Sequence, residues 1–82
     1  MEYNDAAELV TRLVCGFRRV DPAQLAENDD LAETLGFDSL DAAELVAAIH
    51  KETGREFAAA SPQDLSTVRV IAARLAGQEV KA

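Results

Sequence analysis

Leu35-Gly36-Phe37-Asp38-Ser39-Leu40-Asp41, near the middle of this 82-residue chain, predicts a turn followed directly by a helix. Gly36 accepts backbone angles that most residues avoid, which suits the turn. Asp38 is a good N-cap, and Asp41, three residues later, is placed to complete a capping box. Ser39 then lies in the first helical turn, where backbone amides and the helix dipole favour an anion. We therefore expect the Ser39 hydroxyl to face solvent, where it is suited to holding a phosphoryl group.

Apolar residues at spacings of three and four predict long amphipathic helices on both sides of this turn. The first helix has a cap at Asn4 or Asp5 and an apolar face that extends to Phe17. The second begins at Ser39, and Gly54 is placed to end it.

The last third of the chain predicts a short helix and a further long one. Ser61-Pro62 is a start signal for a short helix that ends near Leu65. Thr67, or the serine before it, caps the last helix, and Gly77 is expected to end it. Residues 78–82 should then fray.

These segments predict an all-α fold, a four-helix bundle with three longer helices and one short third helix. A long loop, residues 20–38, joins helices one and two and should contain short helical pieces. We expect one domain over residues 1–82, with its core at about 5–77. Three leucines should pin the loop to that core: Leu25, Leu31 and Leu35.

The negative charge is concentrated in one part of the chain. Residues 20–49 contain eight acidic residues and no Lys or Arg, whereas the whole chain has a net charge of −7. Such a field repels nucleic acid and anionic membranes and attracts basic patches on other proteins. Acidic residues also keep small domains in solution, so the charge alone leaves a docking surface and a solvated surface both open.

Several classes of site and location are disfavoured. Cys15 is the only cysteine, so an intramolecular disulfide or a cysteine metal cluster is impossible, and its helix position suggests packing. Asp29-Asp30 lacks the alternating ligands and glycine of a calcium loop, so we assign no metal. The first five residues lack the features of a signal peptide, and no apolar run is long enough to span a bilayer. We expect a cytoplasmic monomer.

The residues around the central turn also carry a family resemblance. Asp38-Ser39-Leu40-Asp41 continues into Ala42-Ala43-Glu44-Leu45-Val46, and Leu31 and Leu35-Gly36 precede it at the expected distance. Thr67-Val68 opens the last amphipathic segment. Over about residues 5–77 the chain resembles free-standing acyl carrier proteins.

The resemblance implies a chemistry and a set of partners. In that family the serine at the position of Ser39 is esterified by 4′-phosphopantetheine, whose thiol holds the acyl cargo as a thioester. The domain itself is non-catalytic. A phosphopantetheinyl transferase modifies it, and ketosynthase-type or other acyl-processing enzymes with basic docking patches act on the cargo. The resemblance also implies partner-binding residues: Asp38, Leu40, Asp41 and Glu44, with Val46 and Ala47 at the rim.

Departures from the family pattern bear on the pathway. Fatty acid carriers usually continue the second helix with more acidic residues, whereas this chain has His50 and Lys51. Phe37 before the Asp-Ser pair is common in polyketide carriers. The Gly-Gly-His-Ser and Gly-Gly-Asp-Ser patterns of peptidyl carriers are missing. The resemblance therefore favours polyketide or specialised fatty acyl synthesis over an aminoacyl or peptidyl carrier.

Two other interpretations of Ser39 compete with the carrier. A hydrolase nucleophile needs a base and an oxyanion hole. His50 is the only histidine. It lies eleven residues along the same helix, about 16 Å away, so it cannot reach Ser39 and the hydrolase interpretation is disfavoured. The second alternative is an unmodified capping serine in an acidic helical interaction module. Leu40 separates these cases in part, because a docking residue should be exposed and a core residue buried.

Overall fold

The chain forms a helical bundle in the computed structural model, which describes residues 2–54, 57 and 65–80. No strand occurs within these ranges, so the predicted all-α class is confirmed. The elements in chain order are α1 (Tyr3–Arg18), the 3-10 helix η1 (Pro22–Gln24), α2 (Leu31–Leu35), α3 (Ser39–Thr53) and α4 (Val68–Val80).

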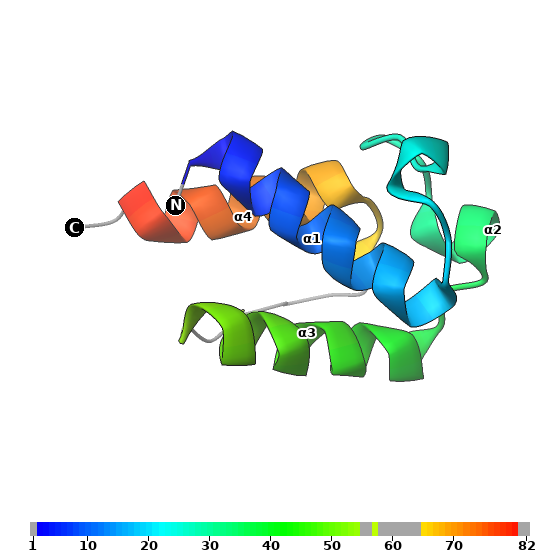
Figure 1. Ribbon diagram of the computed structural model, residues 1–82. Helices are drawn as coiled ribbons and strands as arrows, with labels where there is room; N and C mark the ends of the chain where they lie inside the picture. The colour runs from blue at the N-terminus through cyan, green and yellow to red at the C-terminus, as the bar shows by residue number, and fades with distance from the viewer. Residues whose placement is uncertain (1, 55–56, 58–64, 81–82) are drawn as a thin grey trace.

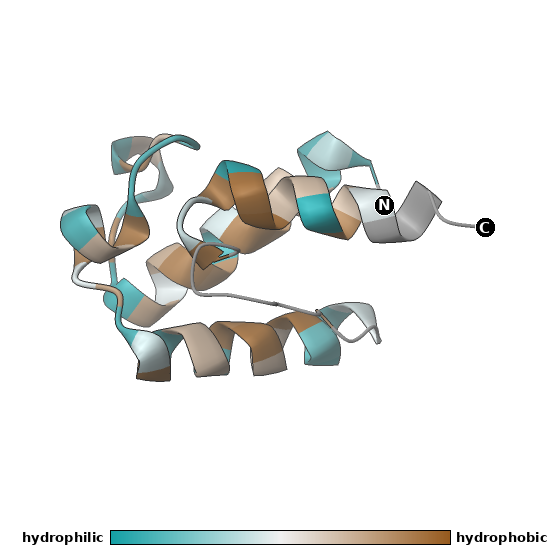
Figure 2. Ribbon diagram, turned by 180° about the vertical axis from the view of Figure 1, so that it is seen from behind, coloured by the Kyte–Doolittle hydropathy of each residue, from teal (hydrophilic) through white to brown (hydrophobic). Residues whose placement is uncertain are grey.

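Helix α1 forms the centre of the bundle. It packs most extensively against α4 and also contacts α3 (Figure 1). The end of α1 approaches the start of α3, and the connection that carries η1 and α2 occupies that side of the molecule (Figure 1). Hydrophobic segments predominate on the packed helices, whereas the connection between α1 and α3 is mostly hydrophilic (Figure 2).

The core consists of the apolar faces that the sequence predicted. Burial of these side chains provides most of the driving force for a domain of this size. Phe57, which follows α3 in the chain, is also buried. The fully buried larger side chains come from α1, α2, α3 and α4: Val10, Val14, Leu31, Leu45, Ile49, Val68 and Ile71.

The long connection between α1 and α3 contains both short helices. Asp21 caps η1 through its side chain, with Pro22 at the first helical position, where proline is favoured. Leu31 is fully buried, and Leu25 and Leu35 pack partly buried against the core, so the predicted pinning is confirmed. Two further hydrogen bonds join this connection to the start of α4: Leu31 N to Ser66 O at 2.8 Å and Arg69 N to Glu27 O at 3.0 Å.

Some predicted helix ends were wrong. Helix α1 begins at Tyr3, with Glu2 as a cap that makes no side-chain hydrogen bond, so neither Asn4 nor Asp5 is the cap. Asp5 instead lies in the first turn, where its charge suits the dipole. Helix α4 continues through Gly77 to Val80. A glycine inside a helix costs only about 1 kcal/mol relative to alanine, so it does not by itself end one.

Other boundaries were predicted correctly. Gly54 ends α3 in the left-handed conformation, with φ 73°. Thr67 caps α4 by accepting a hydrogen bond from Val70 N at 3.1 Å. The short helix expected at 61–65 falls mostly outside the described residues, since only Leu65 is described. No helix in the described part of the chain is long and apolar enough to cross a membrane.

Candidate functional site

The turn before Ser39 is fixed by its own sequence. Gly36 ends α2 with φ 69°, a left-handed conformation that glycine adopts without the penalty of a side chain. The Phe37 side chain is buried in the core, and its amide donates to the Leu31 carbonyl at 3.2 Å. The backbone that enters α3 is therefore anchored on its inner side, and the next residues point outward.

A complete capping box opens α3. The Asp38 carboxylate accepts from Asp41 N at 3.0 Å, and the Asp41 carboxylate accepts from Asp38 N at 3.2 Å. Hydrogen bonds from the Asp41 backbone to the charged form of Asp38 lower the pKa of that carboxyl below its ordinary value. Both halves of the prediction from sequence are confirmed, and Asp38 is ionised at neutral pH.

Ser39 is the first residue of α3, and it is exposed. Leu40, beside it, is 69% exposed, and among the described residues it is the one large hydrophobic side chain in that state. It therefore satisfies the exposure that a docking residue requires and does not belong to the core.

The remaining candidate docking residues differ in how available they are. Glu44 and Ala47 are exposed on α3, and Val46 is half-buried against the core. The Asp41 side chain is only 15% exposed. Its carboxylate is already engaged by donors of this chain, so it serves the capping box first and offers a partner little surface.

Arg18, at the end of α1, also contacts this turn. Its Nε donates to the Leu35 carbonyl at 3.1 Å, and its Nη1 lies 3.3 Å from Asp41 Oδ2. A cation in the last turn of α1 suits the helix dipole, but the dipole does not account for these two contacts. The contacts join residues 17 and 23 positions apart, and no local pattern signals such pairs.

The geometry of α3 disfavours a hydrolase. Ser39 and His50 lie on the same helix, at its beginning and in its last turn. Eleven residues correspond to about 16 Å of helix, so the His50 imidazole is too far away to take a proton from the Ser39 hydroxyl. Ser39 therefore lacks the base that histidine would supply to a nucleophilic serine.

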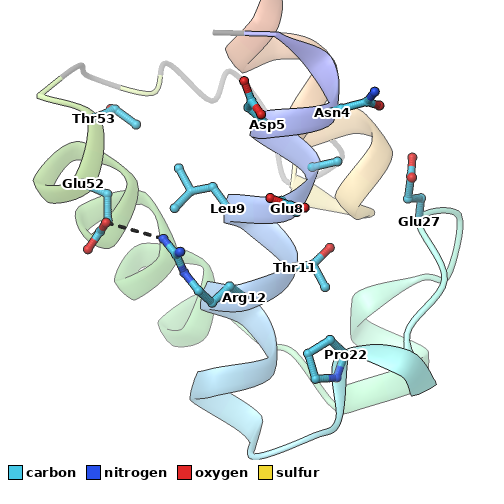
Figure 3. A pocket seen from close by; sticks show the side chains of 11 residues that line it. Asn4, Asp5, Glu8, Leu9, Thr11, Arg12, Pro22, Glu27, Glu52 and Thr53 are labelled. Atoms are coloured by element: carbon cyan, nitrogen blue, oxygen red, sulfur yellow. Dashed lines mark ion pairs between the residues drawn. The ribbon is translucent and has the colours of Figure 1, made fainter.

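A broad depression of about 870 Å³ lies over α1, between the end of α3 and the connection at Pro22 and Glu27 (Figure 3). Polar residues contribute to its lining, among them Glu8 and Arg12 of α1 and Glu52 at the far end of α3. Arg12 and Glu52 form an ion pair at 3.6 Å (Figure 3). The depression lies beside the end of α3 opposite to Ser39.

Comparison with known proteins identifies the family. Residues 8–75 match the family described as the phosphopantetheine attachment site. The chain is also 36% identical over 66 residues to an acyl carrier protein of Zymomonas mobilis, and the match covers 80% of this chain and 85% of that relative. The chain belongs to the acyl carrier protein family.

An acyl carrier protein holds its cargo on covalently attached 4′-phosphopantetheine and is itself generally non-catalytic. The attachment chemistry needs an accessible hydroxyl on a rigid support. An exposed serine at a helix start, enclosed by a capping box and preceded by a buried phenylalanine, has the properties that this group requires.

Proposed function

We propose that Ser39 is the residue that carries the phosphopantetheine group and that this carrier presents acyl intermediates to partner enzymes as thioesters. The main support is the position of Ser39, an exposed serine at the start of α3 inside the region that matches the family. A phosphopantetheinyl transferase makes the modification, and the carrier supplies no catalytic group of its own.

The local electrostatics suit a phosphodiester at this position. The start of α3 directs amide groups and the positive end of the helix dipole toward the attached phosphate. Asp38 and Asp41 carry like charge and do not bind it. Because each carboxylate accepts a hydrogen bond from the other residue's backbone, their role at the attachment point is to hold the helix start.

The exposed side of α3 is the proposed docking surface, made of Asp38, Leu40 and Glu44, with Asp41 contributing least. Val46 and Ala47 form its rim. Leu40 supplies an apolar contact, and Asp38 and Glu44 attract basic patches on the transferase and on acyl-processing enzymes. The eight acidic residues between 20 and 49 speed such encounters. They also disfavour nucleic acid and anionic membranes as partners.

Polyketide or specialised fatty acyl synthesis is the pathway we propose. His50 and Lys51 are exposed in the last turn of α3, which ends the acidic side of the helix with basic residues. An enzyme that depends on a longer acidic ridge would bind this surface less well. An aminoacyl or peptidyl carrier is the alternative within the same family. We further propose that residues 1–82 form one carrier domain that acts as a cytoplasmic monomer.

The test is modification by a broad-specificity phosphopantetheinyl transferase with coenzyme A as the donor. Intact mass should show one group on the wild-type chain and none on Ser39→Ala. Ser66→Ala is the matched control, a half-buried serine before α4 that should be modified like the wild type. An unmodified wild type, under conditions that modify another carrier, would refute the proposal. It would favour an acidic interaction module whose complexes survive Ser39→Ala.

A further inference from the structure

We propose that Arg18 is a positioning residue for the modification of Ser39: its guanidinium holds the turn from Leu35 to Asp41 in the conformation that the transferase binds. The inference rests on the proposed function of Ser39. It adds a residue from α1 to a site that the sequence places on α3 and the turn before it.

Arg18 bridges the two ends of the turn that displays Ser39. Its Nε donates to the Leu35 carbonyl at 3.1 Å, just before the turn. Its Nη1 lies 3.3 Å from Asp41 Oδ2, in the first turn of α3. One side chain therefore fixes the separation of the segments on either side of Ser39.

The contact with Asp41 extends into the capping box. Asp41 Oδ2 accepts from both Arg18 Nη1 and Asp38 N, at 3.3 and 3.2 Å. Asp38 returns a hydrogen bond by accepting from Asp41 N at 3.0 Å. These bonds form a continuous path from the end of α1 to the helix start, so α1 also restrains the Asp41 carboxylate that completes the cap.

The guanidinium lies beside Gly36. A Cβ built on Gly36 would lie 3.5 Å from Arg18 Nη2, which is ordinary van der Waals contact, so Arg18 packs next to this position without requiring a glycine there. Its side chain is 36% exposed, so it is partly shielded from water by the turn that it contacts.

Arginine is suited to this role, and lysine is not an equivalent replacement. The guanidinium is a rigid fork that directs Nε toward one acceptor and Nη1 toward another. A lysine ammonium keeps the charge but is a single point on a flexible stem, so it would not hold both Leu35 O and the Asp41 carboxylate with the same geometry. The positive charge also matters, because it offsets the negative charge of Asp41 close to the residue that we propose carries the phosphate.

The first test compares Arg18→Gln and Arg18→Lys with Arg12→Gln in the transferase assay. Arg12→Gln is the matched control because it removes one charge from α1 and breaks an ion pair with Glu52 away from Ser39. If part of the free Arg18→Gln population has a disordered turn, the KM for the carrier should rise about threefold to tenfold, with kcat little changed. Arg18→Lys should recover only part of this loss, and Arg12→Gln should behave like the wild type.

The second test asks whether the effect passes through Asp41. In the Asp41→Asn background, Arg18→Gln should change KM much less than it does alone, because the shared contact is already weakened. Hydrogen exchange of the Asp38 amide should be faster in Arg18→Gln and unchanged in Arg12→Gln. Assays run well below the melting temperature of each variant, so a general loss of stability would leave KM unchanged.

The outcomes separate the inference from the proposed function. A wild type that accepts no phosphopantetheine would overturn the assignment of Ser39. If the wild type is modified and Arg18→Gln has the same KM, the role of Arg18 is refuted while the assignment of Ser39 stands. Additive effects of Arg18→Gln and Asp41→Asn on KM would refute the role of Arg18 in the same way. If Arg18→Gln does not fold, the test uses Arg18→Lys. A wild-type KM for Arg18→Lys would then refute the argument that Arg18 must contact both the Leu35 carbonyl and the Asp41 carboxylate.

Discussion

Leu45 and Leu40 lie on the same helix, but one is fully buried and the other is 69% exposed. Truncating each to alanine removes the same atoms and makes the same small change in helix propensity. Any difference in stability between Leu45→Ala and Leu40→Ala therefore reports burial alone. The two variants together test how α3 is rotated against the core. That rotation decides which side chains of α3 are exposed for docking.

The expected magnitudes follow from the two exposures. A buried Leu→Ala change costs about 2–5 kcal/mol, and for Leu45 we expect about 3 kcal/mol because the core of this domain is small. One kcal/mol lowers Tm by about 4–8 °C in a domain of this size, so Leu45→Ala should lower Tm by about 12–24 °C. Leu40→Ala should change the free energy of unfolding by no more than about 0.5 kcal/mol.

The effects of the two substitutions on transferase kinetics should have the opposite order to their effects on Tm. Leu40→Ala should raise the KM for the transferase, because it removes the apolar contact of the docking surface while the fold remains intact. Leu45→Ala should leave KM unchanged at temperatures where the variant is folded. The assays are thermal unfolding followed by circular dichroism and transferase kinetics on the same preparations. Equal losses of Tm in the two variants would refute the placement of α3.

Two further predictions concern the turn. Gly36→Ala should lower Tm because alanine in the left-handed conformation costs about 1–2 kcal/mol. Gly77→Ala in α4 is the comparison and should raise Tm, because alanine is more favourable than glycine in a helix by about 1 kcal/mol and nothing lies within 4 Å of the added Cβ. Asp38 has a lowered pKa, so its stabilising effect is present above its ordinary pKa of 3.8 and is lost as pH falls through the lower folded value. The Tm difference between wild type and Asp38→Asn should therefore shrink on acidification below that pKa, and a difference that grows would contradict this.

The sequence by itself determined the local geometry of the site. The Asp38 and Asp41 capping box, the left-handed Gly36 and the first-turn position of Ser39 depend on residues within four positions of one another. Interactions over such short separations are set by side-chain chemistry and backbone sterics. Helical periodicity likewise predicted the apolar faces that form the core, and Leu31 was expected to pin the long loop to them. The exposure of Leu40 was the open question, and the fold answered it.

Only the tertiary structure decided which distant residues meet. The contacts of Arg18 with Leu35 and Asp41, and the hydrogen bond from the Tyr3 hydroxyl to the Glu27 carboxylate, join segments far apart in the chain. The α1 dipole explains a cation at position 18 but not its direction, which depends on how α1 crosses the start of α3. Helix α4 continues past Gly77 to Val80, because a single helical glycine costs too little to end a helix by itself. Local rules place the serine at a helix start, and long-range packing determines what holds that start in place.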